Sequence, residues 1–212
     1  MSRNYEETGR IRQKERTRAA LVAAARDLIT LHGAVPTVAE AAAAAGVSRT
    51  TAYRYFPSLQ ALLVAAHPEI ETTSMLSDPG SDDVVARVET VVRRFLAMVV
   101  DTEPQQRTML RLSLTDGVEQ GALPLRQGRA IGWLHEALAP WKQQLGDDGL
   151  RRLAVAVRAV SGIESLVWLT DVGGLDADQA VDQMVWSAKA LVRQADRETR
   201  GVDESEGSGS AR

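Results

Sequence analysis

The sequence contains no cysteine, so it can form neither a disulfide bond nor a thiolate metal site. Aromatic residues are scarce, at 4% of the chain. No apolar run approaches the roughly 18 residues that a membrane-spanning helix needs, and the charged N-terminal stretch does not resemble a signal peptide. These absences favour a protein of the cytoplasm.

Motifs of enzyme active sites are also missing. The histidines, His32, His67 and His135, are far apart and have no H-E-x-x-H spacing. The sequence has no G-x-S-x-G nucleophile motif and no phosphate-binding glycine loop. We therefore expect no metal, no cofactor and no enzymatic activity, which leaves binding functions.

The charge is distributed unevenly along the 212 residues, whose formal net charge is −3. Residues 1–60 contain nine Lys and Arg against five Asp and Glu, a net charge of +4, so the rest of the chain carries −7. A basic N-terminal module on an acidic body suits a protein that binds DNA with one end, although a solvated start of a helix would also explain the basic run. The length allows one large domain or two small ones with a substantial core.

Apolar residues recur at helical spacing along the chain without convincing strand alternation, so the expected fold class is all-α. Residues 37–63 predict two short helices joined by a tight turn and followed by a third. Thr37 and Glu40 form a T-x-x-E capping box, Gly46 suits the turn, and Ser48 caps the next helix. A short second helix rich in hydrogen-bond donors is typical of proteins that insert a helix into the major groove.

The G-V-S turn at residues 46–48 is followed by the run Y-R-Y-F-P-S at residues 53–58. This segment resembles the helix-turn-helix of the TetR family of transcriptional repressors, and the resemblance is close over residues 10–66. It implies a three-helix DNA-binding head joined to a helical bundle that binds a ligand and dimerises. The implied function is a sequence-specific regulator, in the first place a repressor released from a palindromic operator by a small-molecule inducer.

The composition predicts where these parts begin and end. Residues 77–82 have loop composition, and the C-terminal tail is rich in Gly, Ser and Glu. The expected organisation is a disordered arm at residues 1–9, the helix-turn-helix domain at 10–57, a connecting helix at 58–76, the ligand-binding and dimerisation domain at 77–197 and a disordered tail at 198–212. Within the bundle we expect helices at about 125–145, kinked at Pro140, at about 149–170, and at about 177–197.

The second helix of the motif supplies the candidate base contacts. Arg49 can make a bidentate contact with guanine, worth roughly 1–3 kcal/mol of discrimination, and Thr50 can meet a thymine methyl group. Tyr53 either reaches DNA or packs between helices. The resemblance implies phosphate contacts by Thr51 and Tyr55. The remaining candidates for contacts with DNA are Thr37, Ser48, Arg12 and Lys14.

The sequence departs from the family pattern at several positions. Leu59 stands where relatives often have a phosphate-binding Lys, and Ala39 where some have a base-reading Arg. Specificity should then depend more on the second helix of the motif. Ala41 and Ala52 replace larger apolar residues, so the two helices either approach closely or pack loosely.

One head binds few base pairs, so a palindromic site requires a homodimer. The stripes that offer an interface, or alternatively only fill the chain's own core, contain Val157, Val160, Gly162, Met184, Ala188 and Leu191. The inducer pocket that the resemblance implies has as candidates Phe95, Met98, Met109, Trp133, Trp141, Glu164 and Trp168. Aromatic residues at helical spacing are also ordinary core residues, and Glu164 can instead face solvent or pair with Arg158.

Other functions are compatible with the same features. An activator and a ligand-independent repressor would carry the same head. A helical interaction protein without DNA binding is the third alternative, but it would not need Arg49, Thr50, Thr51 and Tyr55 on one short helix.

Overall fold

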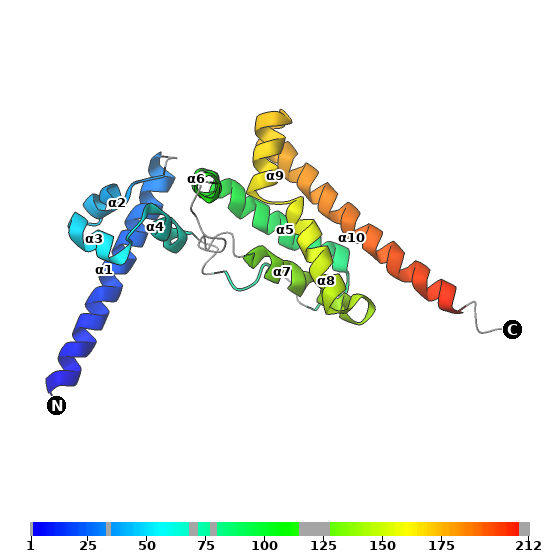
Figure 1. Cartoon of the computed structure of the whole chain (residues 1–212), viewed down its shortest axis with the longest axis horizontal. Helices are drawn as coiled ribbons and strands as arrows, with labels where there is room; N and C mark the ends of the chain where they lie inside the picture. Colours follow the sequence, from blue (N-terminus) through cyan, green and yellow to red (C-terminus); the bar gives the residue numbers. More distant parts are fainter. Residues whose placement is uncertain (1, 33–34, 68–71, 77–79, 115–127, 208–212) are drawn as a thin grey trace. The chain divides into compact units, whose positions relative to one another are not determined.

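The computed structural model describes residues 2–32, 35–67, 72–76, 80–114 and 128–207, and in this part of the chain it contains helices and no strand (Figure 1). The expected all-α class is confirmed. The chain divides into two compact units, one formed by Met1–Glu71 with Thr102–Leu125 and the other by Thr72–Asp101 with Arg126–Arg212. Each unit is described separately below.

The first unit contains the helix-turn-helix. Its helices are α1 (Ser2–His32), α2 (Val38–Ala44), α3 (Arg49–Tyr55), α4 (Leu59–Ala66) and α6 (Glu103–Ser113). Helix α1 packs against both α2 and α4, and α2 packs against α3. The core that these four helices share consists of Leu21, Ala25, Val38, Ala41, Ala42, Ala52, Phe56, Leu62 and Ala66.

The small residues of this core settle how α2 and α3 meet. Ala41 and Ala52 are both fully buried in the shared cluster, so the two helices approach closely and are not loosely packed. Leu59, at the start of α4, packs against Leu63 and Met109 of a second cluster that joins α4 to α6. The apolar residue at position 59 therefore contributes to packing between α4 and α6.

Helix α6 belongs to the first unit, which the sequence pattern did not predict. Besides the contact between Met109 and Leu63, the Gln105 side chain donates a hydrogen bond to the carbonyl oxygen of Leu63. His67, at the end of α4, lies within hydrogen-bond distance of Gln106 (2.9 Å) and Thr102 (3.2 Å). These buried polar groups tie α6 to α4.

Both terminal helices are longer than expected. Helix α1 begins at Ser2, so the expected disordered arm at residues 1–9 is wrong for residues 2–9. Only Gly9 opposes a helix there, and one glycine costs about 1 kcal/mol without ending a helix. The last helix continues to Gly207 because no proline interrupts it, so the tail expected from residue 198 is helical as far as 207. Residue 1 and residues 208–212 lie outside the described residues.

The second unit is a helical bundle. Its elements are α5 (Val84–Asp101), α7 (Arg129–Leu138), the 3-10 turn η3 (Ala139–Trp141), α8 (Lys142–Ala159), α9 (Ile163–Val167), the π-helical turn η4 (Trp168–Val172) and α10 (Ala177–Gly207). Helix α5 packs on α7 and α10, and α8 also packs on α7 and α10, so these four long helices enclose one core.

The bundle helices break where the backbone requires it, and several expected boundaries are wrong. Pro140 ends α7 in the turn η3, and Gly146 interrupts α8 with a φ of 64°. Gly162, at φ 118°, separates α8 from α9, so residues 149–170 do not form the single helix that was expected. The start of α10 is confirmed, because Asp176 and Gln179 cap it reciprocally at 2.8 and 3.1 Å.

Polar side chains fasten neighbouring helices of the bundle. Arg87, buried on α5, donates to the carbonyl oxygens of Glu136 (2.7 Å) and Ala137 (2.9 Å) at the end of α7, where the last carbonyls of a helix lack partners. Glu89 of α5 pairs with Lys189 of α10, and this hydrogen bond is the main reason that the pKa of Glu89 is lowered.

One stretch of the bundle reaches the length and mean hydropathy of a membrane-spanning helix. An 18-residue window within Arg129–Val172 has a mean hydropathy of 1.5, and 39% of it is buried inside the structure. The stretch is not one helix, because Gly146 and Gly162 interrupt it. A spanning helix needs about 20 residues whose backbone hydrogen bonds are all satisfied internally, so this window is weak evidence for a membrane segment.

Candidate nucleic-acid interface

The start of α2 has the capping box that the sequence predicts. Thr37 Oγ1 accepts a hydrogen bond from the Glu40 backbone N–H at 3.1 Å, and the Thr37 backbone N–H donates to Glu40 Oε2 at 2.7 Å. The bond from the Thr37 backbone N–H, followed by one from the Thr37 hydroxyl, lowers the pKa of the Glu40 carboxyl group. The Thr37 hydroxyl also donates to the same carboxylate oxygen at 2.9 Å. Both donors of Thr37 are thus engaged within the protein, and a phosphate there would compete with Glu40.

The turn between α2 and α3 depends on one glycine and one serine. Gly46 has a φ of 65°, a conformation that glycine adopts without steric cost. Ser48 Oγ accepts from the Thr51 backbone N–H at 3.2 Å and donates to Thr51 Oγ1 at 2.9 Å. Ser48 is therefore used for capping, while the Thr51 hydroxyl keeps its own proton available for an external acceptor.

Helix α3 presents one face to the core and the other to solvent. Ala52 is fully buried, and Tyr55 packs partly against the core of the head. Arg49, Thr50 and Tyr53 are exposed, with Tyr53 48% exposed. Tyr53 therefore does not pack between helices in this structure. Arg54 is exposed on the same helix.

Helix α3 is packed on the head through its C-terminal end, and α1 and α4 are joined beside it. Phe56, which caps its C-terminal end, is buried, and the Arg18 guanidinium of α1 lies over its ring at 5.4 Å from the centroid. Arg26 of α1 donates to the carbonyl oxygen of Ala66 at 2.7 Å, at the end of α4. A short helix of seven residues is unstable alone, so this packing fixes the direction in which Arg49 and Thr50 project.

The segment with this geometry also matches a known family. Residues 21–66 match the family described as bacterial regulatory proteins, tetR family. The chain carries the DNA-binding domain of TetR-family regulators. The match runs from the packed part of α1 to the end of α4, so it includes the capped turn and the recognition helix. A transcriptional regulator, not an enzyme, is the function that this family indicates.

One solved structure with likeness to the chain is NalD, the secondary repressor of the MexAB-OprM multidrug efflux pump in Pseudomonas aeruginosa. The sequences are 18% identical, the comparison covers 86% of this chain and 96% of that chain, and the TM-score is 0.45. A likeness of this degree carries no argument about function. A comparison with curated proteins finds no match.

The predicted pocket residues do not all lie together. Phe95 and Trp133 are buried in the bundle with ring centroids 6.2 Å apart, and Arg158 lies over Phe95 at 5.5 Å. Arg158 also pairs with Glu164 at 3.1 Å, which was one of the alternatives for this carboxylate. The contacts therefore run from the Phe95–Trp133 ring pair through the Arg158 guanidinium to the Glu164 carboxylate.

The other pocket candidates lie elsewhere. Met109 is buried on α6 of the first unit, so grouping it with Phe95 has no support from either unit's packing. Trp141 is half-buried in η3, because Pro140 ends the helix that was expected to align it with Trp133. Met98 is half-buried on α5, and Trp168 is 60% exposed.

The predicted interface stripes are mostly core. Val157, Gly162, Met184 and Ala188 are buried within the bundle, and only Val160 and Leu191 are half-buried. Helical periodicity identified the stripes but not which side of each helix faces solvent. Sequence reasoning missed the large apolar side chains that the bundle does expose, which are Val155, Trp168, Val172 and Trp186.

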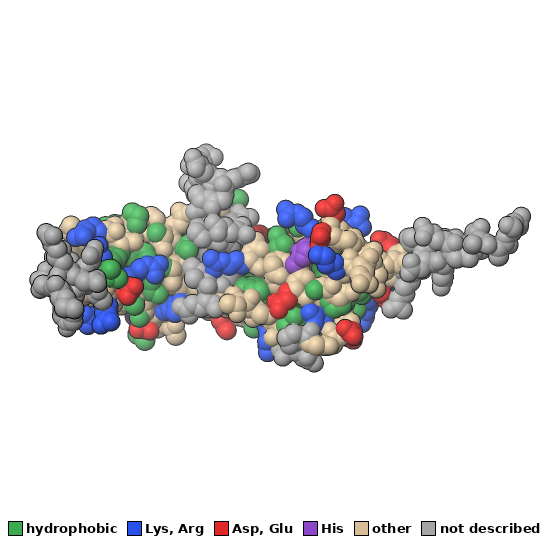
Figure 2. All heavy atoms as spheres, turned by 90° about the horizontal axis from the view of Figure 1, so that it is seen from below, with side chains coloured by type: hydrophobic (Ala, Val, Ile, Leu, Met, Phe, Trp, Pro, Cys, Tyr) green, Lys and Arg blue, Asp and Glu red, His purple; other side chains and the backbone are tan. Residues whose placement is uncertain are grey.

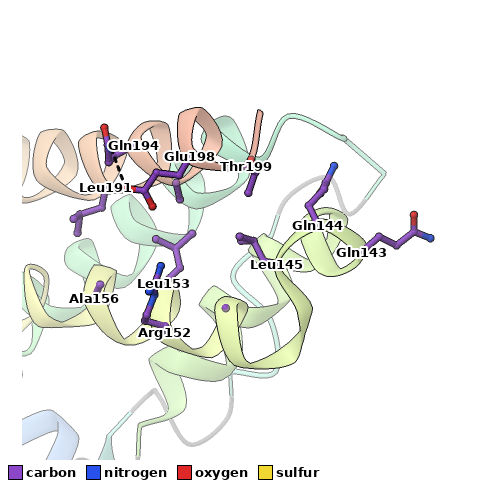
Figure 3. Close-up of a pocket in the computed structure, with 12 residues that line it drawn as sticks. Gln143, Gln144, Leu145, Arg152, Leu153, Ala156, Leu191, Gln194, Glu198 and Thr199 are labelled. Carbon is purple, nitrogen blue, oxygen red and sulfur yellow. Dashed lines mark hydrogen bonds between the residues drawn. The ribbon is translucent and has the colours of Figure 1, made fainter. Parts of the chain in front are cut away.

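Two hollows follow the seam between α8 and α10. One, of about 610 Å³, has Leu153 and Leu191 projecting from facing helices and is also lined by Arg152 and Glu198 (Figure 3). The other, of about 470 Å³, continues along α10 toward Trp168 and is also lined by Glu164 and Met184. The lining residues Gln183, Ser187, Leu191 and Ala195 recur every four residues on α10, so the two hollows lie along one face of this helix. We call the two hollows together the α8–α10 furrow.

Proposed function

We propose that this TetR-family protein is a homodimeric repressor of the cytoplasm that binds a palindromic operator and is released by a small molecule. The observation that carries the proposal is the exposed face of α3, where Arg49, Thr50 and Tyr53 project from a helix whose other face is buried. Such a helix serves recognition from outside, because its polar face contributes nothing to the core.

The contacts divide by what each side chain can reach. Arg49 and Thr50, in the first turn of α3, take the base edges, and Tyr53 takes a base or the adjacent phosphate. Thr51 donates to a phosphate from the hydroxyl that Ser48 orients, and Tyr55 does so from its phenol. Thr37 contributes through the N-terminal end of α2 only where a phosphate displaces the Glu40 carboxylate.

The α8–α10 furrow is the proposed dimer interface. The furrow is lined by the exposed Trp168, and α10 also exposes Trp186, directly before the furrow residue Ser187 in the sequence. Aromatic residues are enriched where interfaces are most strongly held. The partner would be a second copy of this chain, because a palindromic operator requires a two-fold pair of heads and two-fold pairs form by contact of the same surface on both subunits.

The linked side chains of Phe95, Arg158 and Glu164 are the proposed place at which the ligand acts on the bundle. It connects α5, α8 and α9 inside the bundle, so a ligand that separates Arg158 from Glu164 would change how these helices pack. A ligand acts as an inducer only to the extent that it binds the dimer with low DNA affinity more tightly.

Selection of bound duplexes from a random pool tests the DNA-binding part. We expect an inverted repeat whose half-sites are spaced by about one helical turn. Wild-type protein should prefer this duplex over a scrambled one by ~10³-fold or more, and Arg49→Ala should lose ~1–3 kcal/mol of that preference. Equal binding of both duplexes by the wild type would instead favour an interaction protein without sequence-specific DNA binding.

A reporter gene separates repression from activation. With the selected site overlapping its promoter, expression should be lower when the protein is present and recover when a ligand that thermally stabilises the protein is added. Higher expression with the protein present identifies an activator. Repression that no stabilising ligand relieves identifies a ligand-independent repressor.

A further inference from the structure

The N-terminal part of α1 extends beyond the body of the DNA-binding head. In Figure 1 it continues past α3, and all described side chains from Ile11 to Arg16 are exposed. Packing of α1 against the head begins at Leu21, which is fully buried. Residues 11–16 therefore gain no stability from burial in the core of the first unit.

This arm is basic. Between residues 11 and 20 it carries Arg12, Lys14, Arg16 and Arg18 against the single acid Glu15. Lys and Arg side chains lie at the surface of the first unit in the space-filling view (Figure 2). A helix of this length without tertiary packing is marginal in water, so a partner that neutralises its charge would stabilise it.

The cations lie on two opposite faces of the arm. The face of α1 that packs on the head contains Ala25 and Leu21, and the next positions at helical spacing are Arg18 and Lys14. Arg18 confirms the direction of this face, because its guanidinium lies over the ring of Phe56, directly after the recognition helix.

Arg12 and Arg16 lie on the other side, since a step of two residues turns a helix by about 200°. The Arg16 guanidinium donates to Gln13 Oε1 at 2.9 Å, along the arm itself. Lys14 has no ion pair among the residues that the structure describes, and by helical spacing it lies on the same face as Arg18.

We propose that the arm is a second DNA-binding element, in which Lys14, next to Arg18, binds backbone phosphates that flank the bases read by α3. The inference rests on the proposed function, because α3 must first be on DNA. A polyanion is the partner that a cationic helix face beside a recognition helix fits, and phosphate contacts fix position without reading sequence. Of the two arm cations offered by the sequence, this selects Lys14 and leaves Arg12 outside the contact.

Lys14→Ala and Arg16→Ala form a matched pair for the test, because each removes one positive charge from an exposed site of the same helix. Binding of each purified full-length variant to the selected duplex is titrated at several salt concentrations. Each lost phosphate contact flattens the plot of log affinity against log salt by ~0.9. Lys14→Ala should flatten it by that amount per protomer, and Arg16→Ala should leave the slope close to that of the wild type.

A duplex trimmed to the two half-sites is the second measurement. The salt slope of the wild-type protein on this duplex should equal the flatter slope of Lys14→Ala, because the flanking phosphates are gone. The slope of the Lys14→Ala variant should not change when the duplex is trimmed. Equal slopes for Lys14→Ala and Arg16→Ala, or no change with either, would overturn the proposal. If the wild-type protein bound the selected duplex no more tightly than a scrambled one, the proposed function itself would be refuted.

Discussion

Arg158 occupies the space in which a side chain at position 162 would lie. A Cβ built on Gly162 would overlap Nη1 of Arg158 and come within 2.8 Å of its Cζ, and the φ of Gly162 is 118°. The same guanidinium donates to the Ser161 carbonyl oxygen, pairs with Glu164 and covers Phe95. One glycine thus allows a cation to join three elements of the bundle.

Gly162→Ala should destabilise the protein by ~1–3 kcal/mol, because alanine is strained at this φ and its methyl group displaces the Arg158 guanidinium. Denaturant unfolding of the full chain measures the change. Gly132→Ala is the matched control, since a Cβ at that position in α7 meets nothing within 4 Å. The control should be neutral or up to ~1 kcal/mol more stable, because alanine favours a helix over glycine. Equal losses for the two variants would contradict the role assigned to Gly162.

The capping box makes the DNA-binding head sensitive to acid. The pKa of Glu40 is lowered by its hydrogen bonds with Thr37, so the folded protein holds the ionised form more strongly than the unfolded chain does. This stabilisation is fully present above the ordinary pKa of a glutamic acid, about 4.3, and is lost as the pH falls through the lowered folded value.

We therefore expect Glu40→Gln to lower the melting temperature of the full-length protein at neutral pH, and the difference from the wild type to shrink as the pH falls below about 4. Thermal unfolding at a series of pH values measures both. Glutamine keeps an acceptor for the Thr37 N–H, so the difference isolates the charge. A difference that is constant over the whole range would show that the carboxylate charge has no part in the cap.

The sequence predicted the head better than the bundle for a physical reason. Caps and tight turns depend on neighbours three or four residues away, so Thr37, Gly46 and Ser48 could be assigned from spacing alone, and the structure confirms those assignments. Whether a side chain on a bundle helix faces the core depends on helices distant in sequence. Met184 and Trp186 are two residues apart, yet one is buried and the other is 66% exposed.

The exact ends of elements and the partners of charged groups were also beyond local patterns. Pro140 was expected to kink a helix, but it ends α7, because the 3-10 turn that follows changes the direction of the chain. The membership of α6 in the first unit depends on Met109 meeting Leu63, across more than 40 residues of sequence. No periodicity encodes such a contact.

The close approach of α2 and α3 gives a prediction about the small residues between them. Ala41→Leu adds three carbons at a fully buried position, so it should cost ~1–3 kcal/mol of stability and shift α3 relative to α2. Its affinity for the selected duplex should fall more than its stability alone explains, at a temperature where both proteins are folded. Ala43→Leu, on the exposed side of α2, should change neither quantity appreciably. Similar affinities for the two variants would mean that the spacing of α2 and α3 is not critical for DNA binding.

The furrow between α8 and α10 gives a prediction about assembly. Trp186 is 66% exposed on α10, next in sequence to the furrow residue Ser187, and replacing it by aspartate would place a charge where the second copy is proposed to pack. Trp186→Asp should weaken dimerisation by ~30-fold or more, as expected for loss of an aromatic anchor with a charge left in its place. Sedimentation velocity over a range of concentrations measures the dissociation constant. Leu114→Asp is the control, because Leu114 is 73% exposed in the first unit, and its dimerisation should match the wild type. A wild type that is monomeric at every concentration, or two variants whose dimerisation is weakened equally, would place the interface elsewhere.

Because two heads must bind the two half-sites together, Trp186→Asp should also lose affinity for the inverted repeat while keeping the wild-type affinity for an isolated half-site.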